Sequence, residues 1–190
     1  MEKTPLSLRT HITIFGNTNS GKSSLFNKII GQEMAIVSEQ EGTTTDPVTK
    51  AMELIGFGPV ALTDTAGWGD TTQIGDKRQE KTNKLLDRTD FAVYTADITA
   101  FDRTAYEDAL AEFDRRKIPH MLVFTKSDLG KPDLKEFTDA VCVSVKDDKS
   151  IEELRNKLMP INRAYPLEQL MDAIDEYTKL NNAINEYEQI

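Results

Sequence analysis

Eight residues near the amino terminus have the types and spacing needed to hold a chain of phosphates. Gly16 to Ser23 reads GNTNSGKS and matches G-x-x-x-x-G-K-[ST] between an apolar run and a helix-like run. Small residues let backbone N–H groups surround a phosphate, and the following helix adds its positive N-terminal end. We expect Lys22 to reach the β- and γ-phosphates of a nucleotide and Ser23 to ligate Mg²⁺. The residues expected to contact the phosphates are Asn17, Thr18, Asn19, Ser20, Gly21, Lys22, Ser23 and Ser24.

A second motif with phosphate chemistry, Asp64 to Gly67, reads DTAG and follows the apolar run PVALT. We expect Asp64 to hold Mg²⁺ through a water molecule and the N–H of Gly67 to bond the γ-phosphate. Asp-Thr pairs are common at strand ends, so the motif alone would be weak evidence. Its place one helix and one hairpin after the phosphate loop makes it strong evidence for a γ-phosphate sensor.

A third motif, TKSD at Thr125 to Asp128, would select the base. Asp128 could accept hydrogen bonds from the N1–H and 2-amino groups of guanine, whereas adenine offers neither donor. The stem of Lys126 could lie over the base or the sugar. The usual guanine motif begins with Asn, and Thr125 departs from it. A loop that fits a backbone contact to the guanine carbonyl consists of Ser144, Val145 and Lys146. These motifs predict GTP or GDP as the ligand and argue against an ATP-dependent kinase.

The loop GTTTDP, residues 42–47, lies between the first predicted helix and the next strand. GTPases place there a threonine that joins Mg²⁺ only when the γ-phosphate is present. The order of residues favours Thr44, with Thr43 and Thr45 as alternatives. The expected Mg²⁺ ligands are therefore Ser23, Thr44 and Asp64.

Trp68 follows DTAG, where many GTPases have a glutamine that orients the attacking water. An indole cannot do this, so a cation, another loop or a partner must activate the water. The carboxamide of Asn19 could ligate a monovalent cation beside the phosphates, where it would stabilise developing charge. The alternative is that Asn19 only stabilises its own turn. The residues expected to act on the reacting phosphate are Asn19, Lys22, Thr44 and Gly67.

The elements that must position these motifs alternate between strand-like and helix-like runs. This alternation predicts an α/β P-loop NTPase with a mostly parallel sheet and helices on both faces. The strand candidates are HITIF, VTKAMELI, PVALTD, DFAVYTAD, PHMLVFTK and DAVCVSVK, the second and third forming a hairpin around residues 56–58. Helices are expected at 22–31, 78–88, 102–116 and 131–139, and residues 32–47 read as a loop.

The last segment differs in character, so we divide the chain into a nucleotide-binding domain at 1–160 and a helical tail at 161–190. The tail has an apolar stripe with helical spacing, formed by Leu167, Leu170, Ile174, Tyr177, Leu180, Ile184 and Tyr187. It could pack on the sheet as a terminal helix or act as an oligomerisation helix.

Composition limits the class of protein. The chain has 190 residues, 38% of them hydrophobic, and a net charge of −9, which is expected of an acidic, soluble protein. This charge argues against binding to nucleic acid or to an anionic membrane. Cys142 is the single cysteine, so an internal disulfide and a multi-cysteine cluster are excluded; we expect it to be a buried strand residue. Without a long apolar stretch or a signal core, a cytoplasmic location is expected.

The ensemble GNTNSGKSSLFN, GTTTDP, DTAGW and TKSD resembles the TrmE/Era-like GTPases, which have a hydrophobic residue in place of the catalytic glutamine. Within that group the chain is most similar to the GTPase domain of the HydF family, the FeFe-hydrogenase maturation factors. The stretches that carry this likeness are GQEMAIVSEQEGTTTDPVTKAMEL, GPVALTDTAG, IGDKR and KTNKLLDRTDFAV. The resemblance covers about residues 7–160.

This resemblance implies slow GTP hydrolysis that K⁺ stimulates, with Asn19 as the K⁺ ligand. It implies contacts with other hydrogenase maturation proteins that depend on the nucleotide. Apart from the resemblance, a homodimer through the switch loops or the C-terminal helix is a further possibility. The cysteine/histidine cluster domain that follows in that family has no counterpart here, so we expect a fragment, a split protein or a relative with another role. The alternatives are a GTP-dependent scaffold without turnover and a TrmE/Era-like GTPase in RNA modification or ribosome assembly.

Overall fold

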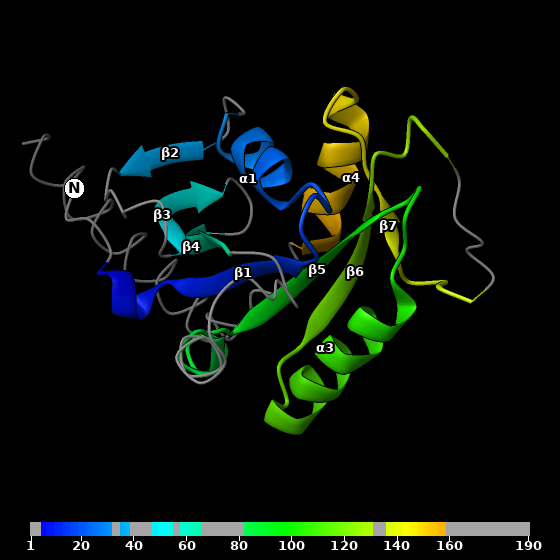
Figure 1. Ribbon diagram of the computed structural model, residues 1–190. Coiled ribbons are helices and arrows are strands. Elements are labelled where there is room, and N and C mark those ends of the chain that lie inside the picture. Colours follow the sequence, from blue (N-terminus) through cyan, green and yellow to red (C-terminus); the bar gives the residue numbers. More distant parts are fainter. Residues whose placement is uncertain are drawn as a thin grey trace, which may run out of the picture.

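The computed structural model describes residues 5–31, 35–38, 47–54, 58–65, 82–130 and 136–158. Within them a seven-stranded sheet has the order β2-β3-β4-β1-β5-β6-β7 (Figure 1). The strands are β1 (Thr10–Gly16), β2 (Ala35–Ser38), β3 (Val48–Leu54), β4 (Gly58–Asp64), β5 (Phe91–Asp97), β6 (His120–Thr125) and β7 (Val141–Cys142). The described helices are α1 (Lys22–Ile30), α3 (Arg103–Arg116), α4 (Asp148–Leu158) and the 3₁₀ turn η1 (Leu6–Leu8), and residues 82–86 are also helical.

The register of the sheet brings four strand ends to one edge. β1 pairs in parallel with β4 and β5, and Ile14 lies opposite Asp64 while Gly16 lies opposite Thr95. β6 continues the parallel part, with Thr125 opposite Asp97. Loops that leave the carboxyl ends of parallel strands meet at that edge, where α/β proteins bind ligands.

Helices cover both faces of the sheet, as the alternation of elements predicts. α1 and α4 lie on one face and α3 lies on the other (Figure 1). Leu25 and Phe26 of α1 join Ile151, Leu154 and Leu158 of α4 in a buried cluster with one face of the strands. On the opposite face, Phe113 and Ala109 of α3 pack with Phe15, Tyr94, Phe124 and Leu86. Alternate side chains of β1 therefore contribute to both buried clusters, because successive residues of a central strand point to opposite faces of the sheet.

The α/β fold class is confirmed, and so are several element boundaries. β3 and β4 are antiparallel, from Val48 opposite Asp64 to Leu54 opposite Gly58, which is the expected hairpin. α1 ends at Ile30 with Gly31 as its C-cap. α3 begins after Asp102, whose side chain accepts a hydrogen bond from the N–H of Ala105 and caps the helix.

Four expectations differ from the structure. Residues 35–38 form the edge strand β2, antiparallel to β3, although the surrounding segment reads as a loop. The strand predicted at 139–146 is only Val141–Cys142. In the segment predicted as a helix at 131–139, residues 136–139 are not helical, and the ring of Phe137 packs against Phe101 and Phe124 instead. Cys142 is half-buried rather than buried, because β7 is the edge strand beside β6.

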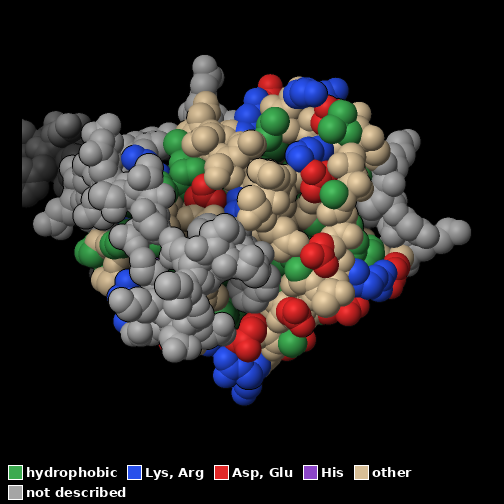
Figure 2. Space-filling model, viewed as in Figure 1, with side chains coloured by type: hydrophobic (Ala, Val, Ile, Leu, Met, Phe, Trp, Pro, Cys, Tyr) green, Lys and Arg blue, Asp and Glu red, His purple; other side chains and the backbone are tan. Residues whose placement is uncertain are grey.

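The surface of α3 carries both signs of charge (Figure 2). Arg115 and Arg116 lie in its last turn, and both form ion pairs with Glu112. Arg116 also pairs with Asp87. These pairs offset the positive charge at that end of the helix. Among the described helices, none has the length and apolar character needed to cross a bilayer.

Several sequence predictions lie outside the described residues. They concern Thr43, Thr44, Thr45, Gly67, Trp68 and the tail at 161–190. Their roles stay predictions.

Candidate nucleotide-binding site

The loop between β1 and α1 has the backbone of an anion cradle. Gly16 has φ +143°, and a Cβ there would lie 2.2 Å from Thr95 O, so only glycine fits. Gly21 has φ +85° and is the N-cap of α1. Glycine has no side-chain acceptor to cap the helix, so the first N–H groups of α1 can donate hydrogen bonds to a bound anion.

A buried network of hydroxyl groups fixes this loop to the neighbouring strands. Ser20 Oγ lies 2.8 Å from Thr95 Oγ1, which donates to Phe15 O at 3.0 Å. Thr125 Oγ1 lies 2.7 Å from Ser20 O and 3.2 Å from Ala96 O, so its hydroxyl proton is shared between two carbonyls. Thr125 is 5% exposed. The hydroxyl of Thr125, the departure from the usual motif, is thus used to hold the phosphate loop.

Lys22 is folded over the loop that it follows. It is buried, and its Nζ donates to Asn17 O at 2.7 Å. This contact places the ammonium group inside the curve of the loop. Ser23 and Ser24 follow in the first turn of α1 and are exposed.

Asp64 ends β4 beside β1 and has a buried acceptor without a donor. Among the described residues nothing donates to its Oδ1, although this atom is buried. Its neighbour Thr65 donates from Oγ1 to Ile14 O at 2.8 Å and fixes the strand end. An unsatisfied buried acceptor costs about 1–3 kcal/mol, unless a cation or its water occupies it. Oxygen donors of this kind suit Mg²⁺, so Asp64 and the hydroxyl of Ser23 fit that ion.

The carboxylate of Asp128 is held in place on the loop after β6. Ser144 Oγ donates to its Oδ1 at 2.8 Å, and Lys146 Nζ donates to its Oδ2 at 2.7 Å. The hydrogen bond from Lys146, followed by that from Ser144, lowers the pKa of Asp128. The carboxylate is therefore ionised at neutral pH and acts as an acceptor. The N–H of Ser144 is in turn bonded to Ser150 Oγ at 3.0 Å, so α4 positions this loop.

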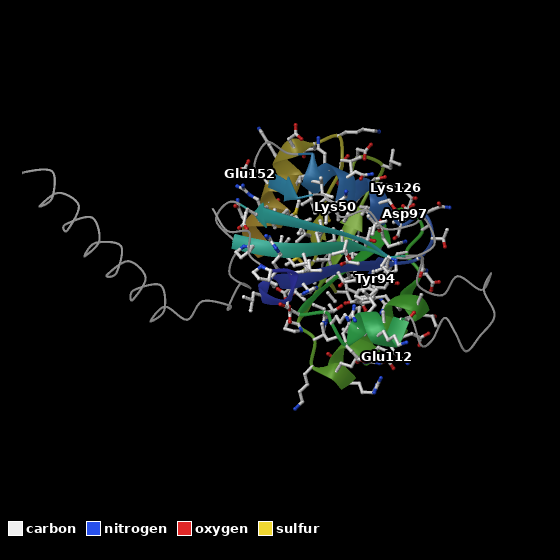
Figure 3. The ribbon with its side chains drawn as sticks, turned by 90° about the vertical axis from the view of Figure 1, so that its left-hand side faces the viewer. Lys50, Tyr94, Asp97, Glu112, Lys126 and Glu152 are labelled. Atoms are coloured by element: carbon white, nitrogen blue, oxygen red, sulfur yellow. The ribbon has the colours of Figure 1, made fainter. Side chains whose placement is uncertain are left out.

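Lys126 connects the base motif to the phosphate loop. Its Nζ donates to Asn19 O at 3.2 Å and to Asp97 Oδ2 at 2.5 Å. Figure 3 shows Asp97 and Lys126 pointing toward one another at one end of the sheet. Sequence reasoning missed Asp97. Its only signal was an acid at the carboxyl end of a predicted strand.

A second contact ties the phosphate loop to the start of α3. Asn17 Nδ2 donates to Asp102 Oδ2 at 3.2 Å, so the helix cap also holds the loop. Beside this contact lies a pocket of about 110 Å³, lined by residues of the loop, of the end of β5 and of the segment 100–102.

The structure thus brings most of the predicted site residues to one edge. The loop 16–24, Asp64, the motif 125–128 and the loop 144–146 lie at neighbouring strand ends. Val145 is 39% exposed on the last of these loops. Thr44 and Gly67 are outside the described residues, so the γ-phosphate side of the site is only partly placed.

Curated relatives are similar over most of this chain. GTPase Der of Kosmotoga olearia is 30% identical over 190 aligned residues, covering 88% of this chain and 43% of the relative. The tRNA modification GTPase MnmE of Dichelobacter nodosus is 35% identical over 156 residues, 78% of this chain and 34% of the relative. The chain therefore spans less than half the length of these relatives.

Solved GTPase structures have the same fold. Era of Aquifex aeolicus bound to GDP·AlF₄⁻ matches with a TM-score of 0.58 and 22% identity, covering 77% of this chain and 56% of that one. The G domain of the T. maritima iron transporter FeoB matches with a TM-score of 0.58 and 21% identity, over 82% of this chain and 99% of that one. Residues 11–126, more than half of the chain, match the family described as 50S ribosome-binding GTPase, and the chain belongs to this family.

Proposed function

We propose that this chain binds GTP and GDP together with Mg²⁺ and hydrolyses GTP to GDP and phosphate. The observation that carries the proposal is the convergence of the loop 16–24 and Asp128 at one edge of the sheet. The two belong to loops that Lys126 and Thr125 join directly, through Asn19 O and Ser20 O. This arrangement fits a ligand with phosphates at one end and a guanine at the other.

Each residue of the site has a distinct role in this proposal. Lys22 and the first N–H groups of α1 hold the β- and γ-phosphates, and Asp128 accepts the two N–H donors of guanine. Ser23, Asp64 and Thr44 hold Mg²⁺, with Thr44 and the N–H of Gly67 sensing the γ-phosphate. When bound, Mg²⁺ would neutralise charge on the phosphate oxygens. Hydrolysis is slow, because Trp68 cannot orient the attacking water.

We further propose that K⁺ assists hydrolysis and that Asn19 is its ligand. Asn19 is exposed on the phosphate loop, and its main-chain carbonyl takes the hydrogen bond from Lys126. The carboxamide can therefore face a cation beside the phosphates without giving up that contact.

The test is release of phosphate from GTP by wild-type protein and Asn19→Ala in KCl and in NaCl at equal ionic strength. We expect faster release in KCl for wild type, and the same slow rate in both salts for the variant. If wild type released phosphate at the same rate in the two salts, the proposed role of K⁺ in hydrolysis would be wrong. Tight GTP binding without turnover in any salt would favour the second candidate, a GTP-dependent scaffold, which the absence of a glutamine at position 68 supports.

For the pathway we propose FeFe-hydrogenase maturation, on the strength of the stretches GTTTDPV, KAMEL and GPV. Named relatives point to a different role, because MnmE is a tRNA modification GTPase and a solved structure shows Era with part of 16S ribosomal RNA. Deletion of the gene separates the two roles. Loss of hydrogenase activity with normal tRNA and ribosomes is expected, and the reverse would assign the chain to RNA.

A further inference from the structure

Asp97 is a largely buried carboxylate that the predicted site does not include. Its side chain is 14% exposed at the carboxyl end of β5. Oδ1 accepts hydrogen bonds from the N–H of Thr99 at 2.9 Å and from its Oγ1 at 2.7 Å. Oδ2 faces Lys126 Nζ at 2.5 Å. Both oxygens are thus engaged, and Thr99 fixes the direction in which the carboxylate points.

Lys126 carries the effect of this carboxylate to the phosphate loop. Its side chain is 38% exposed, and its ammonium bridges Asp97 Oδ2 and Asn19 O. A half-exposed lysine bonded only to one neutral carbonyl at 3.2 Å would exchange that contact for water. The largely buried carboxylate of Asp97 holds the ammonium where it can reach Asn19.

The backbone of Asn19 is in the left-handed region, which differs from the conformation of the strand and helix on either side of it. Its φ is +63°, a region that asparagine visits more readily than other non-glycine residues, because its short polar side chain can hydrogen-bond locally. The direction of its carboxamide depends on this backbone conformation. Lys126, which holds the Asn19 carbonyl, has φ +57° itself. Two residues in this conformation are therefore tied together by one ammonium group that Asp97 directs.

We infer that Asp97 is a positioning residue that fixes the conformation of Asn19 through Lys126. It thereby orients the Asn19 carboxamide toward a monovalent cation. This inference rests on the proposed function of Asn19. Asp97 does not act on base selection, because Asp128 is held by Ser144 and Lys146 rather than by Lys126.

The first test needs no hydrolysis, because it follows amide hydrogen exchange of the nucleotide-free full chain. Asp97→Asn keeps the shape but removes the charge that holds Lys126. We expect the Ser20 amide, which donates to Asn17 O at 3.1 Å, to exchange several-fold faster in the variant. The matched control is Glu112→Gln, which removes a carboxylate from two arginines on α3 and should leave this peptide unchanged. Figure 3 places Glu112 away from Asp97 and Lys126.

A second variant shows whether the effect passes through Lys126. In a Lys126→Met background, Asp97→Asn should add nothing further to the exchange of the Ser20 amide. An additive increase, or unchanged exchange in the single variant, would overturn the inference.

The last test measures the consequence for the cation. We expect Asp97→Asn to raise the K⁺ concentration for half-maximal GTP hydrolysis several-fold. The rate at saturating K⁺ and the preference for guanine over xanthine nucleotides should stay near wild type. If K⁺ stimulates wild type but the requirement of the variant is unchanged, or its rate falls equally at every K⁺ concentration, Asp97 does not set the aim of Asn19. If K⁺ does not stimulate wild type, the proposed cation is wrong, and hydrogen exchange alone decides whether Asp97 fixes the loop.

Discussion

At the scale of single residues, the phosphate loop is shaped by hydroxyl groups that fix it to the neighbouring strands. Gly16 permits the close approach to Thr95, and Ser20, Thr95 and Thr125 join their hydroxyls behind the loop. Because these hydroxyls are buried, losing one leaves its partner carbonyls unsatisfied. The conformation of the loop is therefore set by β5 and β6 before a ligand arrives.

Thr125→Val tests this support, because valine keeps the shape of threonine without the hydroxyl. Ser20 O and Ala96 O lose their shared donor, so the free energy of unfolding should fall by about 1–2 kcal/mol. Affinity for GDP should fall several-fold, since the loop is less well ordered. Urea unfolding and a titration with fluorescent GDP measure the two effects. Thr125→Ser keeps the hydroxyl, so its stability and its affinity for GDP should fall much less. Equal losses of stability and affinity in both variants would show that the hydroxyl does not support the loop.

The ion pair of Asp97 predicts a dependence of stability on pH. Burial acts to raise the pKa of Asp97, but hydrogen bonds from Lys126 and Thr99 outweigh it and hold this pKa below its ordinary value of 3.8. A carboxylate with a lowered pKa stabilises the fold above its ordinary value, and the contribution disappears as pH falls through the lowered pKa.

Wild type should therefore be more stable to urea than Asp97→Asn near neutral pH, and the difference should shrink below about pH 4. Unfolding curves of the two proteins at several pH values measure this difference. A difference that stays constant down to the acid range would show that the charge of Asp97 contributes nothing.

At the scale of elements, the packing of α3 on the sheet involves one large buried side chain, that of Phe113. Phe113 of α3 is fully buried, and its ring centroid lies 5.3 Å from that of Phe15 on β1. It links the helix to the strand from which the phosphate loop departs. The packing of α3 therefore supports the position of the loop.

Phe113→Ala should lower the free energy of unfolding by about 3–5 kcal/mol, because it leaves a cavity between α3 and β1. Urea unfolding is the measurement. Asp108→Ala, an exposed position on the same helix, is the control and should change stability by less than about 0.5 kcal/mol. A loss below about 1 kcal/mol for Phe113→Ala would mean that α3 is not packed in this way.

The sequence predicts these elements well where the pattern is local. β1, the hairpin of β3 and β4, α1 and α3 follow from apolar runs, glycines and caps. β2 escapes prediction because four residues in a polar segment become a strand only by pairing with β3. In the site, too, only local patterns are predictable from the sequence: the phosphate and base motifs are recognised by the spacing of their residues. The role of Asp97 is not predictable in this way, because its contact with Lys126 joins residues 29 positions apart.

At the scale of the whole molecule, the described site residues and both buried clusters lie before residue 159. The chain spans less than half the length of the curated relatives GTPase Der and MnmE. The domain boundary predicted at residue 160 stays a prediction, and we propose that residues 1–160 fold alone.

A chain of residues 1–160 should accordingly keep the GDP affinity of the full chain within about twofold, a change of less than about 0.5 kcal/mol. Fluorescent GDP titration measures this, and light scattering of both chains shows whether the tail oligomerises. The loss of binding on truncation would contradict the domain boundary, and the tail would then be part of the folded unit.

The central claim, a guanine site completed by Asp128, is tested most directly by one substitution. Asp128→Asn replaces an acceptor by a group that can donate to the additional carbonyl of xanthine. Titrations with fluorescent GDP and XDP should show GDP affinity falling about 100-fold or more while XDP becomes the preferred ligand. Asp114→Asn, an exposed position on α3, should leave the preference for GDP unchanged. If Asp128→Asn still prefers GDP as strongly as wild type does, Asp128 does not read the base and the proposed site is wrong.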